Sequence, residues 1–92
     1  TLELRSYMFI CQAMENVDRH ARARTCSIAL RVEDEFVHME VADDGTAPAD
    51  GYHAGEGIRL MARLAAYDPR DEFRIEPTAE GGTMVLARLW RR

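Results

Sequence analysis

The order of apolar and polar residues along the chain predicts two helices. Over residues 4–23, apolar side chains recur at steps of three and four, the spacing of an amphipathic helix. Its expected inner face consists of Leu4, Tyr7, Met8, Cys11, Met14, Val17 and Ala21. Residues 57–67 repeat the spacing, and the pair Asp68-Pro69 is expected to end this second helix because the residue before a proline disfavours helical backbone. Its apolar positions are Ile58, Met61, Leu64 and Ala65.

Four further segments have the two-residue alternation of strands. Residues 26–32 and 36–42 alternate around the polar triplet 33–35, which predicts a hairpin. A short strand is expected around 73–75, and after a turn at Gly81-Gly82 the last strand covers 83–90. The alternating residues are Ile28, Leu30 and Val32 on one side of the first strand, Val37, Met39 and Val41 on one side of the second, and Val85, Ala87 and Leu89 in the last. His38 is expected opposite Val37, on the solvent side. This order predicts an α+β fold: a two-layer α/β sandwich with a mostly antiparallel sheet and the helices on one face.

Length and composition limit the class of protein. Ninety-two residues fit one domain, 1–92, and 47% hydrophobic with 30% charged residues is typical of a globular chain. The net charge of -4 argues against a nucleic-acid partner, which would favour a basic surface. Cys11 and Cys26 lack the spacing of a zinc or redox motif, so we expect both in the core and a cytoplasmic, reducing compartment. Because the chain does not begin with Met, we interpret it as a fragment of a longer chain.

Four short segments carry candidate chemistry. They are Gln12–Ala21 (QAMENVDRHA), Val41–Gly45 (VADDG), Gly55–Ile58 (GEGI) and Gly81–Thr83 (GGT). Each is common by itself: glycines at a helix start or in a hairpin turn are ordinary features. Their combination in this order, with a hairpin between the first and the second, is hard to obtain by chance.

On these residues the chain resembles the ATP-binding domain of the GHKL ATPases, most closely the catalytic domain of bacterial sensor histidine kinases. Within that group it is similar to the short-lid type paired with helix-turn-helix response regulators. The resemblance covers residues 8–90: 16–21 match the N box, 43–45 and 55–58 the two glycine boxes, and 82–83 the final Gly-Thr. It implies the Bergerat-type ATP-binding fold with ATP and Mg²⁺ as cofactors.

The resemblance also implies roles for individual residues. Asn16 would offer an amide oxygen to Mg²⁺, while Arg19 and His20 would donate to phosphate. Asp43 would accept a hydrogen bond from the exocyclic amine of adenine, with Thr83 beside it.

The glycines complete the implied site. Gly45 would let the backbone pass close to the base, because it has no side chain to obstruct the approach. Gly55 and Gly57 would leave backbone N–H groups open to phosphate at a helix N-terminus.

The implied reaction is phosphoryl transfer from ATP to a histidine on a separate dimerisation domain of the same parent chain, followed by a response regulator. That histidine is absent here, since His20 belongs to the N box, so no catalytic residue is expected in the fragment. The fragment would be monomeric and its parent a homodimer, with membrane attachment of the parent left open.

Two positions depart from the family pattern. Gln12 stands where the family usually has an acid. Because an amide cannot act as a base, ATP hydrolysis is disfavoured more than phosphotransfer. A role for Gln12 at the metal stays open. Ala47 replaces a glycine in the expected mobile lid, residues 46–55. Two alternatives therefore remain: a degenerate module that docks a partner without ATP, or a related serine kinase that is an anti-sigma factor.

Overall fold

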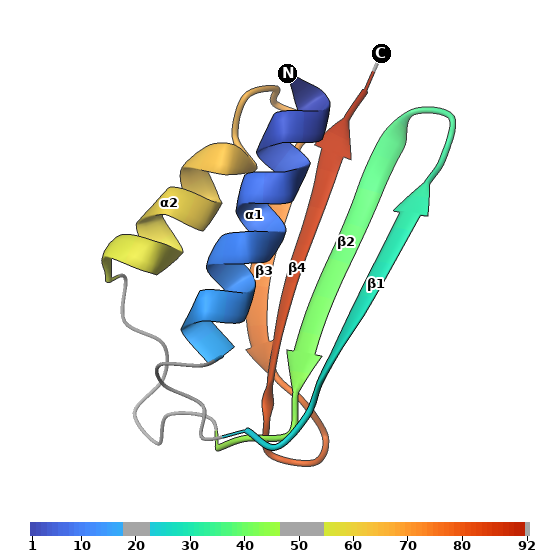
Figure 1. Ribbon diagram of the computed structural model, residues 1–92. Helices are drawn as coiled ribbons and strands as arrows, with labels where there is room; N and C mark the ends of the chain where they lie inside the picture. The colour runs from blue at the N-terminus through green and yellow to red at the C-terminus, as the bar shows by residue number, and fades with distance from the viewer. Residues whose placement is uncertain (18–22, 47–54, 92) are drawn as a thin grey trace.

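The computed structural model describes residues 1–17, 23–46 and 55–91. In chain order the elements are α1 (Leu2–Asn16), β1 (Cys26–Val32), β2 (Phe36–Asp43), α2 (Glu56–Leu64), β3 (Glu72–Pro77) and β4 (Thr83–Trp90). The strands form one antiparallel sheet in the order β1-β2-β4-β3. Both helices lie on the same face of this sheet (Figure 1), which confirms the predicted two-layer α+β arrangement.

The core fills the space between the helices and the two central strands. Alternate residues of β2 and β4 point into it, as the sequence pattern predicts, and both helices contribute to it. The buried side chains are Phe9, Ala13, Val37, Met39, Val41, Met61, Leu64, Ala65, Val85, Ala87 and Leu89. The prediction for α2 is confirmed, since Met61, Leu64 and Ala65 are all buried.

The predicted inner face of α1 is wrong. Phe9 and Ala13 are fully buried, whereas Leu4 and Tyr7 are 55% and 66% exposed. Both cysteines are exposed as well, so the expectation that they lie in the core is also wrong. The helix carries a second apolar stripe with the same spacing, and this one faces the sheet because Phe9 packs edge-on against Phe73 of β3, with ring centroids 6.1 Å apart.

The helix bounds differ from the prediction: α1 begins earlier, and α2 is shorter than predicted. Helix α1 begins one residue after Thr1, whose hydroxyl accepts a hydrogen bond from Leu4 N at 3.1 Å, and it ends at Asn16. Residues 18–22 of the predicted helix lie outside the described residues, and Ala23 is not helical. Helix α2 ends at Leu64, because the carboxylate of Asp71 accepts hydrogen bonds from Tyr67 N and Asp68 N and so turns the chain early.

His38 lies opposite Val37 as expected, but it is not exposed to solvent, since only 7% of it is accessible. Its side chain lies on the sheet face away from the helices, between Arg31 of β1 and Arg88 of β4 in the strand register. Its Nε2 atom is 2.9 Å from Glu40 Oε1. Because β2 is an interior strand, side chains from both neighbouring strands cover this position.

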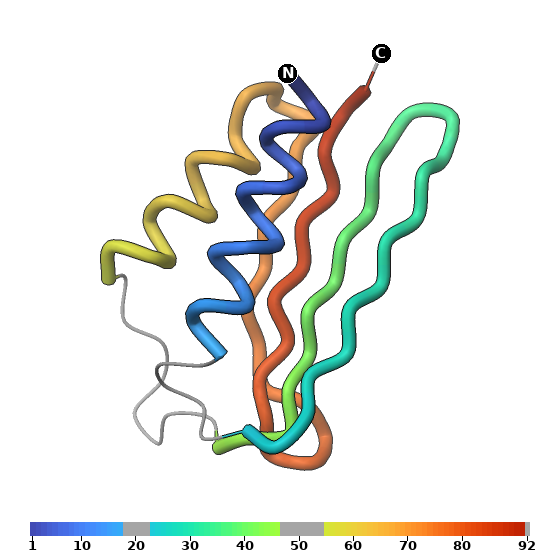
Figure 2. Tube along the Cα trace, viewed as in Figure 1, coloured from blue at the N-terminus to red at the C-terminus, as the bar shows by residue number. Residues whose placement is uncertain are grey.

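The trace in Figure 2 shows that the N-terminal end of α1 and the C-terminal end of β4 lie close together at one end of the sheet. Neither α1 nor α2 is long and apolar enough to cross a membrane.

Candidate functional site

The residues of the sequence motifs gather at the end of the sheet opposite the chain termini. Strand β2 ends there at Asp43, β4 begins there at Thr83, and α1 ends there (Figure 1). This follows from the antiparallel order, because β2 runs toward this end and its neighbour β4 starts from it. The topology thus brings three of the four motif segments to one end of the sheet, and α2 joins them through its contact with α1.

Asp43 and Thr83 form the polar centre of this end. The register pairs Ala42 with Met84, so Asp43 and Thr83 are the next facing positions. By strand alternation both side chains lie on the helix-covered face, the face of Val41 and Val85. Counted over the whole residue they are 7% and 6% exposed, and among the described polar or charged residues only His38 is buried to the same extent by this measure. A buried polar pair under the helices is unusual enough to mark a candidate binding site.

The carboxylate of Asp43 is oriented by the turn that follows it. Gly45 N donates a hydrogen bond to Asp43 Oδ1 at 2.8 Å. The neighbouring Asp44 has a different role, which the sequence did not indicate: its Oδ1 atom accepts hydrogen bonds from Arg24 N at 2.8 Å and Thr25 N at 3.0 Å. These hydrogen bonds lower the pKa of Asp44 and join the start of β1 to the end of β2.

Gly82 is required by the close approach of two backbones at the same place. A Cβ atom on Gly82 would overlap the carbonyl oxygen of Asp43 and would lie 3.3 Å from Asp43 Oδ1. Gly81, in the preceding turn, has φ of 92°, which glycine adopts most readily. The predicted turn at Gly81-Gly82 is therefore confirmed, and the glycine pair holds Thr83 against the end of β2.

A second contact joins α1 to the start of α2. A Cβ atom on Gly57 would lie 2.8 Å from Gln12 Nε2, so the Gln12 amide lies against the first turn of α2. Gly55 is the N-cap residue in extended conformation, and apart from its chain neighbours no described heavy atom lies within 4 Å of its Cβ position. The first-turn N–H groups of α2 follow directly after Gly55.

Several expected site residues are less defined. Asn16, the last residue of α1, is half-buried, which allows its amide to contact solvent or a ligand. Arg19, His20, Ala47 and most of the expected lid lie outside the described residues. Among the residues that the structure describes, no group of three His, Cys, Asp or Glu side chains could hold a metal ion.

No family model matches the chain.

Proposed function

We propose that this chain is the ATP-binding catalytic domain of a sensor histidine kinase of the GHKL type, with a Bergerat-type fold. The observation that carries the proposal is the pair of Asp43 and Thr83, both buried on the helix-covered face where β2 ends and β4 begins. A carboxylate and a hydroxyl in adjacent positions suit the edge of adenine, which offers an amino donor beside a ring nitrogen acceptor. The carboxylate would accept from the amine and the hydroxyl would donate to the ring nitrogen. This favours adenine over guanine, which has a carbonyl oxygen and a ring N–H in the same places.

The phosphates would extend from this pair toward α2. Gly55 and Gly57 add no side chain of their own at the start of α2, on either side of Glu56, and N–H groups with the positive end of the helix dipole would favour phosphate there. Asn16 would offer its amide oxygen to Mg²⁺, which reduces the charge on the phosphates when bound. The sequence resemblance proposes Arg19 and His20 as hydrogen-bond donors to the phosphates.

The chain's own part in the reaction would be to bind and orient ATP. Phosphoryl transfer depends mainly on positioning and on charge stabilisation. The acceptor histidine would belong to the dimerisation domain of the parent chain, and a response regulator would receive the phosphoryl group afterwards.

Isothermal titration with a non-hydrolysable ATP analogue and Mg²⁺ tests this proposal. Asp43→Asn should weaken binding by about 10- to 100-fold, the loss expected when a hydrogen bond to a buried charged group is removed. Asp44→Asn is the matched control, because it makes the same charge change at the adjacent exposed carboxylate. Equal effects of the two substitutions, or absence of heat at millimolar nucleotide for the unaltered chain, would contradict the proposal.

A partner-docking module without nucleotide is the second candidate, and the position of Gln12 favours it. Its amide lies against Gly57, at the helix turn that phosphate would approach. A ligand that binds the native state alone must raise the melting temperature. An unchanged melting temperature at saturating Mg²⁺-ATP would support the docking module and exclude ATP binding.

A further inference from the structure

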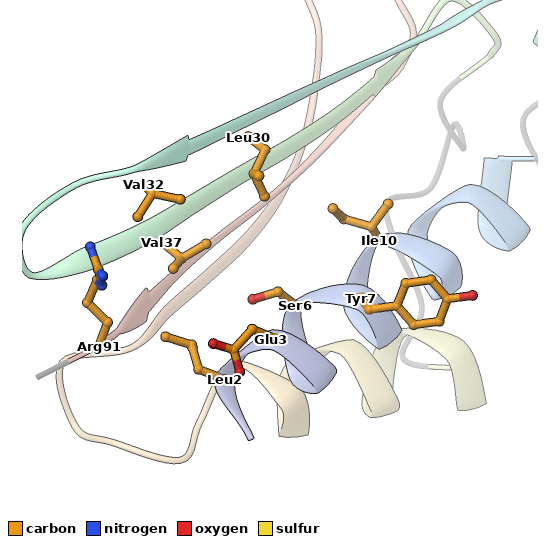
Figure 3. A pocket seen from close by; sticks show the side chains of 9 residues that line it. All are labelled: Leu2, Glu3, Ser6, Tyr7, Ile10, Leu30, Val32, Val37 and Arg91. Carbon is orange, nitrogen blue, oxygen red and sulfur yellow. The ribbon is translucent and has the colours of Figure 1, made fainter.

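A groove of about 370 Å³ lies between α1 and the hairpin of β1 and β2, a size typical of pockets for small ligands. Figure 3 shows the side chains that line it, which are Leu2, Glu3, Ser6, Tyr7, Ile10, Leu30, Val32, Val37 and Arg91. The groove is near the end of the sheet that holds the chain termini. Asp43 and Thr83 lie at the other end of β2 and β4, so this groove is separate from the proposed nucleotide site.

Most of the groove surface is apolar. Figure 3 shows Leu30, Val32 and Val37 on its sheet side, with Leu2 and Ile10 of α1 opposite them. Leu30 and Val32 are 52% and 61% exposed although they lie on the helix-covered face of the sheet. An apolar group in the groove would remove this surface from water, which is favourable.

Two opposite charges also line the groove. The carboxylate of Glu3 is exposed in the first turn of α1, and Arg91 directly follows β4. Arg91 Nη1 donates to the carbonyl oxygen of Glu33 at 2.6 Å, which holds the guanidinium at the hairpin end of the groove and uses one of its five N–H donors. Within residues 1–17, 23–46 and 55–91, no ion pair joins Glu3 to Arg91. The groove therefore presents one negative and one positive group to a ligand.

Ser6 adds a hydroxyl group on the α1 side. Its Oγ atom is out of contact with solvent and has no hydrogen-bond partner in the described part of the chain. A buried hydroxyl without a partner is unfavourable, and rotation about χ1 can turn this one into the groove that Ser6 lines. A ligand oxygen beside Ser6 would supply the missing acceptor.

We infer that this groove binds the zwitterion of an apolar α-amino acid. The ammonium group pairs with Glu3, and the carboxylate pairs with Arg91 and accepts from Ser6. The apolar side chain lies along Leu30 and Ile10. Charge complementarity selects this class of ligand, because an apolar carboxylate without an amine would place a second negative charge near Glu3. An apolar amine without a carboxylate would place a second positive charge near Arg91.

Titration of the ¹⁵N-labelled 92-residue chain with L-phenylalanine, followed by amide chemical shifts, tests this inference. Two analogues keep the apolar body and lose one charge each: 2-phenylethylamine has no carboxylate, and 3-phenylpropanoate has no ammonium group. Phenylalanine should have a dissociation constant about 2- to 5-fold lower than either analogue, the contribution of one exposed ion pair. The shifts should be largest at groove residues such as Ile10, Val32 and Val37.

Two charge variants assign each ion pair. Glu3→Gln should remove the advantage of phenylalanine over 3-phenylpropanoate, and Arg91→Gln should remove its advantage over 2-phenylethylamine. Glu80→Gln is the control, because it neutralises an exposed acid in the turn before β4, and it should leave all three dissociation constants unchanged. Equal effects of Glu3→Gln and Glu80→Gln would show that net charge, and not a pair at Glu3, is involved, and would overturn the inference.

A pair of substitutions on β1 tests the apolar part of the site. Leu30→Ala should raise the dissociation constant for phenylalanine by about 3- to 10-fold, because it removes apolar contact area. Ile28→Ala is the matched control, since Ile28 is 46% exposed on the same face of β1 but does not line the groove. Equal effects of these two substitutions, equal affinity for all three ligands, or no shifts at about 20 mM phenylalanine would each overturn the inference.

Discussion

Gly82 lies so close to Asp43 that its α-carbon has no room for a side chain. A Cβ atom there would overlap the Asp43 carbonyl oxygen. The two residues are 39 positions apart in the sequence, and the antiparallel pairing of β2 with β4 brings them together. This contact determines where Thr83 lies relative to Asp43, and the proposed adenine site depends on it.

Gly82→Ala should therefore destabilise the fold by about 2–4 kcal/mol, since the strand ends must move apart to admit the methyl group. Gly81→Ala is the control. It introduces an alanine at positive φ where no heavy atom lies within 4 Å of the Cβ position, and should cost only about 1–2 kcal/mol. Urea denaturation measures both. Equal destabilisation by the two substitutions would mean that turn conformation, and not the approach to Asp43, makes glycine necessary.

Asp71 should be the most sensitive carboxylate of the fold. Its side chain is fully buried and accepts hydrogen bonds from Trp90 N at 2.7 Å, from Tyr67 N at 3.0 Å and from Arg5 Nη1 at 3.4 Å. Asp71→Ala leaves these donors without their acceptor and should lower the free energy of unfolding by about 3–5 kcal/mol. Denaturant titration beside Asp68→Ala checks this, because Asp68 pairs with a half-exposed Arg70 and its loss should destabilise the fold much less. A larger loss of stability for Asp68→Ala than for Asp71→Ala would show that Asp71 is not the acceptor that joins α1, the segment after α2 and the end of β4.

The orientation of α1 can be tested with two large-to-small substitutions. Phe9→Ala should cost about 3–5 kcal/mol because Phe9 is completely buried and contacts Phe73. Leu4→Ala should have an effect below about 1 kcal/mol, since Leu4 is more than half exposed. Thermal or urea unfolding distinguishes the two cases. A larger loss for Leu4→Ala would restore the inner face predicted from the sequence.

Stability should fall at acidic pH partly through Asp44. Backbone hydrogen bonds from Thr25 and Arg24 lower the pKa of this carboxyl below its usual 3.8 in the folded chain. A lowered folded-state pKa means that the contribution is present above the unfolded pKa and is lost as the pH falls through the folded pKa. Asp44→Asn should therefore be less stable than the unaltered chain at neutral pH, and the difference should shrink below about pH 4. Unfolding curves from pH 7 to pH 2 measure this; a constant difference would show that the charge of Asp44 is not involved.

Much of the fold could be predicted from local pattern. The alternation of β2 and β4 placed Val37, Met39 and Val41 on one side of β2 and Val85 and Leu89 on one side of β4. In the structure these sides are the buried ones. The glycine turn at 81–82 was likewise predictable, since the residues that adopt positive φ are few. The candidate site residues Asp43, Thr83 and Gly57 were identified by their order along the chain.

Only the tertiary structure decided which sides of α1 and β1 are covered. Helix α1 carries two apolar stripes, and Phe9 faces inward because Phe73 and α2 contact it there, which no spacing within the helix indicates. Apolar and polar residues alternate in β1 as they do in β2, yet β1 remains exposed. It is the edge strand of the sheet, and α1 lies over β2 and the groove instead. His38 is buried because β2 is an interior strand, with side chains of β1 and β4 on either side of it. The sequence by itself determined the elements and their alternation; which face each element buries depended on its neighbours, because burial is a property of contacts between segments distant in the chain.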